Sequence, residues 1–202
     1  MTQNQSDTTQ WPVLNEAHEI LRAAVRGVPA DAWTSATPCS EWNVTQVLQH
    51  AAGDQLGYAA FITGGPGPDE NPFAPSGTLS GSPEAVVESA LQAAAAAWST
   101  VAADAAEVPV PIPPNKMSAE IGAGACALDA AVHAWDIAVA TGQPSPLTPE
   151  LARALMPAAE ATVTDPIRQY GMYAAAQEAR DGDDDVAALL RFLGRDPHWT
   201  AA

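Results

Sequence analysis

The sequence is short of cations and of cysteine. One lysine and seven arginines oppose 24 acidic residues, which leaves a formal net charge of −16. Such a chain has no basic patch of the kind that binds nucleic acid, so no nucleic-acid partner is expected. Its two cysteines, Cys39 and Cys126, cannot form a disulfide framework. We expect a soluble protein with a repulsive, acidic surface.

The sequence also has no long apolar run and no leader pattern. No apolar stretch approaches the length of a membrane span, so no membrane partner is expected. Residues 1–10 are polar, without the basic region and apolar run of a secretory signal. We therefore expect a cytoplasmic protein, with a disordered N-terminal tail over residues 1–10 and a single domain over residues 11–202.

Large aliphatic side chains are scarce, and alanine stands in their place. There are 44 alanines among 202 residues, whereas Leu, Ile, Val and Phe together number 36. A share of large apolar residues below about 20% is typical of disorder when net charge is high. The charge per residue is nevertheless low, six tryptophans are present, and alanine is the best helix former. The composition favours closely packed helices over a disordered chain.

Apolar residues recur at helical spacing in six segments. Helices are predicted over residues 11–27, 43–63, 82–104 and 118–141, from 148 onward, and over 184–193. Asn43 with Gln46 has the pattern of a capping box. Gly122 and Gly124 weaken the start of the 118–141 helix, and Pro157 is expected to kink or divide the helix after 148.

The segments between these helices lack helical patterning. Residues 64–82 are rich in Gly and Pro and predict a long loop, which is either a mobile surface or a binding loop. The proline-rich residues 108–114 predict an extended crossover, and residues 165–183 are ambiguous. The fold class is therefore all-α, a four-helix bundle with additional C-terminal helices.

The best candidate site lies on the predicted 118–141 helix. Asp129 and His133 are four residues apart, so they are neighbours on one helix face and can reach one ion at about 2.0–2.2 Å. His50, at the edge of the apolar stripe of the 43–63 helix, can supply a third ligand. Two histidines and a carboxylate with an open position are the pattern of catalytic zinc, and they also suit Ni²⁺ or Fe²⁺.

A structural alternative exists for each of these residues. A chain with four histidines and this many acids gives an acid four residues before a histidine about once in two sequences by chance. Asp129 and His133 are then a pair on a helix surface, and His50 is a half-buried histidine whose hydrogen bonds are satisfied.

Other polar residues are expected around the site or in the core. Asp54, one turn after His50, or Asp136 would orient the ligands by hydrogen bonds. His18 and Trp135 lie on apolar stripes and are expected behind the ligands or in the pocket wall, with the core as a further alternative for His18. The two cysteines are expected to behave as small buried hydrophobes, and His198 is expected to be exposed.

Three separated motifs resemble one known family. They are residues 37–44 (Thr-Pro-Cys-Ser-Glu-Trp-Asn-Val) leading to His50, the segment 129–142, and residues 193–197 (Leu-Gly-Arg-Asp-Pro) with Trp199. Together they resemble the actinobacterial branch of the DinB-like superfamily that is related to mycothiol-dependent maleylpyruvate isomerase. The resemblance implies a DinB-like four-helix bundle that binds one divalent metal, usually zinc. The metal ligands that it implies here are His50, Asp129 and His133.

The resemblance also implies a reaction class. Relatives use mycothiol or another low-molecular-weight thiol, and a zinc-bound thiolate is a nucleophile at neutral pH. A transferase or isomerase acting on a small electrophilic substrate is therefore expected, with attack by water as the variant that needs no thiol. We expect no counterpart of the isomerase's further C-terminal domain within these 202 residues, so that specific isomerisation is not carried over from the resemblance. The alternatives are a non-catalytic bundle that binds a metal or a small molecule, and a repurposed biosynthetic enzyme. A homodimer is compatible with either.

Overall fold

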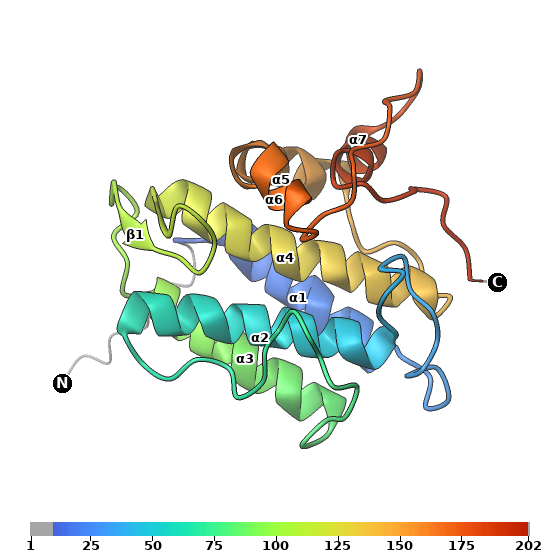
Figure 1. The fold of residues 1–202 in the computed structure, drawn as a ribbon, viewed down its shortest axis with the longest axis horizontal. Helices are drawn as coiled ribbons and strands as arrows, with labels where there is room; N and C mark the ends of the chain where they lie inside the picture. The colour runs from blue at the N-terminus through green and yellow to red at the C-terminus, as the bar shows by residue number, and fades with distance from the viewer. Residues whose placement is uncertain (1–9, 202) are drawn as a thin grey trace.

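Four helices form the body of the molecule. The computed structural model describes residues 10–201, and in it α1 (Pro12–Arg26), α2 (Val44–Thr63), α3 (Pro83–Trp98) and α4 (Ala119–Ala140) pack side by side (Figure 1). Helix α1 contacts α3 and α4, and α2 contacts the same two helices on the other side. Each helix therefore has two neighbours, which confirms the predicted four-helix bundle.

The C-terminal helices cover one side of this bundle. Helix α5 (Pro149–Thr162) packs on α4, and α7 (Asp185–Phe192) packs on α5, with the short α6 (Asp165–Gln169) beside them (Figure 1). The predicted tail falls outside the described residues except for Gln10. The side-chain amide of Gln10 donates to the carbonyl of Val101 at 2.7 Å.

The helix starts follow the capping residues. The side chain of Asn43 accepts from the backbone N–H of Gln46 at 3.0 Å, and the Gln46 side chain accepts from the N–H of Asn43 at 3.1 Å. This capping box satisfies two N–H groups that the first turn of α2 leaves unpaired. Ser82 and Thr148 cap α3 and α5 by accepting one hydrogen bond each, from the N–H of Ala85 and of Leu151, and each is followed by proline.

The predicted end of the third helix was wrong. Helix α3 stops at Trp98 rather than near residue 104. The hydroxyls of Ser99 and Thr100 donate to the carbonyls of Ala96 and Ala97, both at 2.7 Å. These side chains compete with the backbone for the last carbonyls, so the helix ends there.

The sequence suggested that the glycines of α4 weaken the start of this helix, and this prediction was wrong. Glycine is present at these positions because neighbouring side chains approach the helix closely. The helix is regular from Ala119. A Cβ at Gly122 would lie 2.9 Å from the ring of Trp98, and a Cβ at Gly124 would lie 2.8 Å from the Cβ of Ala158. Similarly, Pro157 lies inside α5 without dividing it.

The proline-rich crossover contains a small hairpin that the sequence did not predict. Strand β1 (Val108–Pro109) pairs antiparallel with β2 (Lys116–Met117). The segment is extended, as expected, and two residues on each side suffice for one short ladder. It connects α3 to α4 across the end of the bundle (Figure 1).

Helix α4 is the centre of the core. It is long and apolar enough to cross a membrane by length and composition, contrary to the expectation that no such stretch exists, but 89% of the window is buried inside the protein. Four of its alanines, at 127, 130, 131 and 134, are fully buried. Small side chains let α1, α2 and α5 approach α4 from several sides, so α4 is the core helix of a globular protein.

Candidate metal centre

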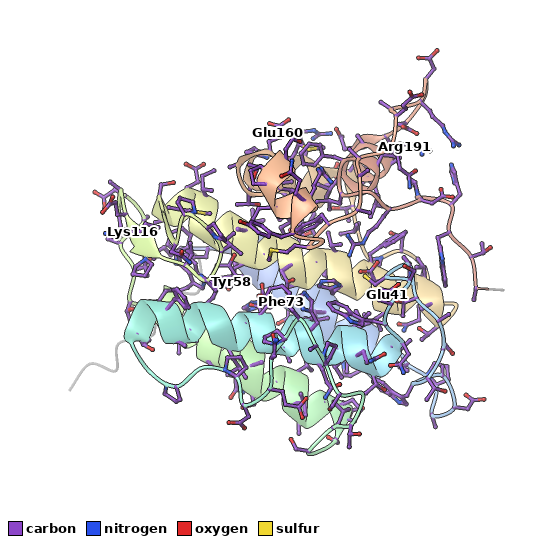
Figure 2. All side chains as sticks on the ribbon, viewed as in Figure 1. Glu41, Tyr58, Phe73, Lys116, Glu160 and Arg191 are labelled. Carbon is purple, nitrogen blue, oxygen red and sulfur yellow. The ribbon has the colours of Figure 1, made fainter. Side chains whose placement is uncertain are left out.

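A cavity of about 360 Å³ lies between α2, α4 and the C-terminal segment. Its wall is mostly aromatic and aliphatic, with polar groups gathered on α2 and α4, and Figure 2 shows Tyr58 and Phe73 in the space between these helices. The lining residues are Cys39, Trp42, His50, Asp54, Tyr58, Phe73, Ile112, Ala125, Leu128, Asp129, His133, Thr162, Ile167, Tyr170, Gly171, Met172, Tyr173 and Arg195.

The three residues singled out as metal ligands meet at the wall of this cavity. The Nε2 atom of His133 lies 3.3 Å from Oδ1 of Asp129, and the Nε2 atom of His50 lies 3.5 Å from the same oxygen. One ligand atom from each residue lies within 4.8 Å of the other two. Helix α2 supplies His50, and one turn of α4 supplies Asp129 and His133, all with less than a tenth of their surface exposed.

The hydrogen-bond partners of the two Nδ1 atoms show which ring nitrogen of each histidine carries the hydrogen. Nδ1 of His50 lies 2.9 Å from the carbonyl oxygen of Pro72, which can only accept. Nδ1 of His133 lies 2.9 Å from the carboxylate of Asp136, which also accepts. Both Nδ1 atoms therefore carry hydrogen, and each Nε2 faces Asp129 with its lone pair unless the ring is protonated.

This arrangement fits a bound cation. Two imidazole lone pairs and a carboxylate oxygen that face one another repel, and only a positive charge between or upon them makes the geometry favourable. In addition, Oδ2 of Asp129 is buried without a hydrogen-bond partner in the described part of the chain, which is costly. Protons on the rings or a divalent ion can supply the charge, and two nitrogens with one carboxylate are suitable donors for zinc.

The pKa shifts of the site residues also favour a positive charge beside Asp129. Burial by itself raises the pKa of Asp129, but the charge of His133 and hydrogen bonds from His133 and His50 outweigh it and hold the pKa well below its usual range. Burial lowers the pKa of His133, and Asp129 and Asp136 more than reverse this, so its pKa lies well above 6.5. Asp129 is thus held as an anion that attracts positive charge.

Asp136, which was predicted with Asp54 as a residue that could orient a ligand, contacts Nδ1 of His133 at 2.9 Å. It is itself held by a cation that was not predicted from the sequence. Nε and Nη2 of Arg195 donate to the two carboxylate oxygens of Asp136 at 2.9 and 2.7 Å. Although burial raises the pKa of Asp136, Arg195 and His133 hold it well below its usual range. A carboxylate that accepts from the back of a ligating histidine fixes its ring orientation and increases its basicity.

Cys39 also belongs to this cluster. Its Sγ lies 3.2 Å from Oδ2 of Asp136 and 3.3 Å from Nη2 of Arg195. Cys39, His133 and Asp136 form a second set close enough to hold a metal. The guanidinium of Arg195 already occupies that carboxylate, so we assign the candidate site to His50, Asp129 and His133.

Asp54 lines the cavity instead of bonding to a ligand. No hydrogen bond from its side chain to another described residue is observed, and burial followed by the charge of Asp129 raises its pKa well above 3.8. The hypothesis that Asp54 orients a ligand by hydrogen bonding is therefore not met by the geometry. Burial likewise raises the pKa of its neighbour Tyr173 to about 12, so both groups can hold a proton at the cavity wall.

His18 and Trp135 lie away from the cavity. Trp135 is 2% exposed and belongs to the apolar core of α4. His18 is buried, and its Nε2 lies 2.9 Å from Oε1 of Gln55. The pocket-wall alternative was therefore wrong for both, because their stripes turn toward the bundle interior, and they are core residues.

His18 gives a pH-dependence prediction. Burial lowers its pKa from 6.5 to about 4. Between these pH values His18 is therefore protonated in the unfolded chain and neutral in the folded protein. Above pH 6.5 the neutral His18 therefore contributes about 3 kcal/mol to the free energy of unfolding, and this contribution is expected to be lost as the pH drops to about 4. Urea unfolding of wild type and His18→Gln across this range checks it, since the variant lacks this component. If the free energy of unfolding depends on pH equally in wild type and in His18→Gln, the prediction for His18 is wrong.

Three residues of the site were not predicted as site residues, although Trp42 lies within the family motif at residues 37–44. Trp42 lies with its ring centroid 4.6 Å from that of His50, and Phe73 lies 5.4 Å from it. Phe73 is in the loop 64–82, which has no periodicity, and Arg195 is 59 residues from its partner Asp136. Only the Leu-Gly-Arg-Asp-Pro motif at residues 193–197 marked the region of Arg195.

The fold and the site together define a helical bundle with a candidate divalent-metal centre at the wall of a cavity. The chain belongs to the mycothiol maleylpyruvate isomerase N-terminal domain family, whose model matches residues 14–138. This confirms the resemblance found in the sequence motifs, and metal dependence is general in the family.

Two relatives match most of the chain. Both are uncharacterized proteins of Mycobacterium tuberculosis, one from strain CDC 1551 / Oshkosh and one from strain ATCC 25618 / H37Rv. Each is 32% identical over 187 residues, which cover 89% of this chain and 93% of the relative. No solved structure matches the chain.

Proposed function

We propose that the protein is a metal-dependent enzyme that uses a low-molecular-weight thiol, mycothiol in the first instance, to attack a small electrophilic substrate. The observation that carries the proposal is the convergence of His50 and His133 on Asp129 at the cavity wall. Three protein ligands leave coordination positions for a thiol or water, the pattern of a catalytic rather than a structural site. Zinc is the metal that we propose.

A divalent ion at this point would lower the pKa of a coordinated thiol or water. The residues around it have separate tasks. Asp136 and the carbonyl of Pro72 hold the two imidazoles with Nε2 toward Asp129. Asp54 can hold a proton at the wall, since its pKa is raised. Trp42, Phe73 and Leu128 line the cavity with apolar surface, which excludes water from the reacting groups.

The cellular setting proposed for this reaction is the cytoplasm. A thiol-using enzyme needs its co-substrate reduced, and thiols stay reduced in the cytosol. Both cysteines of the chain are free, which agrees with such a compartment.

Cobalt-loaded protein tests the two halves of the proposal separately. We expect one Co²⁺ per chain by elemental analysis, and a sulfur-to-cobalt charge-transfer band when mycothiol is added. Absence of bound metal contradicts the metal site. Bound metal without the band contradicts the thiol reaction and leaves water as the nucleophile or a non-catalytic metal bundle. Adding mycothiol to cobalt-loaded Cys39→Ser distinguishes a band due to mycothiol from one due to the protein thiol.

A further inference from the structure

Residues 70–78, called the strap below, lie across α2 and are fastened to it by two glutamines. The side chain of Gln49 accepts from the N–H of Gly77 at 2.6 Å and donates to the carbonyl of Thr78 at 2.9 Å. Gln46 donates to the carbonyl of Pro75 at 3.1 Å. Figure 1 shows this loop passing in front of α2. These bonds give a segment without regular secondary structure a defined position.

The middle of the strap touches His50. The carbonyl oxygen of Pro72 lies 2.9 Å from Nδ1 of His50, and the ring of Phe73 meets the imidazole edge to face. The approach is close because position 53 is glycine: a Cβ there would lie 2.9 Å from Cγ and 3.1 Å from Cβ of Pro72. An added methyl group therefore requires Pro72 to move.

We propose that Gln49 and Gly53 are positioning residues for His50. By holding the strap against α2 they place the Pro72 carbonyl where it fixes the hydrogen of His50 on Nδ1 and leaves Nε2 facing Asp129. Neither residue belongs to the three proposed ligands. This inference rests on the proposed metal site for its consequence, but the state of the imidazole is a property of the chain itself.

The physical reason is that an imidazole has one hydrogen for two nitrogens. Which nitrogen keeps the hydrogen is set by the partner of the other one, and a carbonyl at Nδ1 is a partner that accepts only. Without Pro72 in place, Nε2 of His50 carries the hydrogen for part of the time. In that tautomer the ring donates toward Asp129 and has no lone pair for a cation. Loss of such an orienting partner costs about 10–100-fold in metal affinity.

Nitrogen-15 NMR of the histidine rings at about pH 8 tests the proposal without a metal. In wild type we expect His50 as the Nδ1–H tautomer. In Gly53→Ala and in Gln49→Ala we expect that signature to be lost or mixed with Nε2–H. The matched controls are Gly57→Ala on the same helix, where a Cβ makes ordinary contact with Pro111 at 3.7 Å, and Gln92→Ala, which removes an exposed amide bonded to Glu88. Both controls should keep the wild-type signature.

Zinc affinity and thermal unfolding complete the test. Gly53→Ala should bind zinc at least about tenfold more weakly. Its unfolding temperature should stay close to that of wild type, because the better helix propensity of alanine offsets the loss of the Pro72 contacts. This combination separates positioning from loss of fold. An unchanged Nδ1–H signature in both variants, or an Nε2–H tautomer in wild type, overturns the proposal. If wild type binds no zinc, the proposed function fails while the tautomer measurement still decides the role of the strap.

Discussion

Replacing His133 with alanine is expected to lower zinc affinity by more than 100-fold. Losing only a hydrogen-bond partner of a ligand costs about 10–100-fold, and this variant removes the ligand itself together with the link between Asp129 and Asp136. His50→Ala removes the other imidazole from a different helix and should have an effect of similar size. Competition titration against a zinc-binding dye measures both.

The same experiment has a stability readout with two histidine controls. Zinc at about 100 times its dissociation constant stabilises a folded protein by about 2.7 kcal/mol, so wild type should melt at a higher temperature when zinc is present. His133→Ala and His50→Ala should lack this increase. The controls are His198→Ala at an exposed position and His18→Gln in the core, and both should retain it. Zinc binding of wild-type strength in His133→Ala rules out the assigned ligand set.

Replacing Arg195 with methionine is expected to destabilise the fold by about 3–5 kcal/mol. Asp136 is fully buried and accepts two hydrogen bonds from the guanidinium. Breaking a buried ion pair by removing one partner leaves an uncompensated charge, and costs of this size follow. Urea unfolding at neutral pH gives the difference between the two proteins.

A double variant separates the structural role of this pair from its effect on the metal. In Arg195→Met with Asp136→Leu the buried charge is gone, and most of the lost stability should return. Zinc affinity should stay low, because Nδ1 of His133 no longer has its carboxylate partner. Full recovery of zinc affinity in the double variant shows that Asp136 does not orient His133. A stability loss below about 1 kcal/mol in Arg195→Met shows that solvent or another cation replaces Arg195.

The parts of the fold that follow from local rules were predictable. Asn43 and Gln46 fixed the start of α2 because a capping box needs only residues three apart. Gly122 and Gly124 misled the interpretation, because the reason for them is the ring of Trp98 and the methyl group of Ala158, which are distant in sequence. The end of α3 was missed because the hydroxyl bonds of Ser99 and Thr100 decide it.

In the candidate site too, the parts that follow from local rules were predictable and the long-range contacts were not. Asp129 and His133 share a helix face, so their proximity follows from helix geometry. His50 was predicted as the third member from its place at the edge of an apolar stripe, and the family motifs agreed. The contacts of His50 with Pro72 and Phe73, and of Asp136 with Arg195, join segments that only the folded chain brings together. No periodicity encodes such contacts, and the sequence accordingly missed Phe73 and Arg195.

The proposed ligands and a large part of the cavity wall lie in different stretches of the chain. All three proposed ligands lie within residues 14–138, whereas a large part of the wall, from Thr162 through Tyr173 to Arg195, lies beyond that stretch. Substitutions at wall positions such as Thr162, Ile167 and Met172 can change the shape of the cavity without altering a ligand. Proteins that share the stretch matched by the family model can therefore differ in the shape of this cavity through changes in their last 60 or so residues.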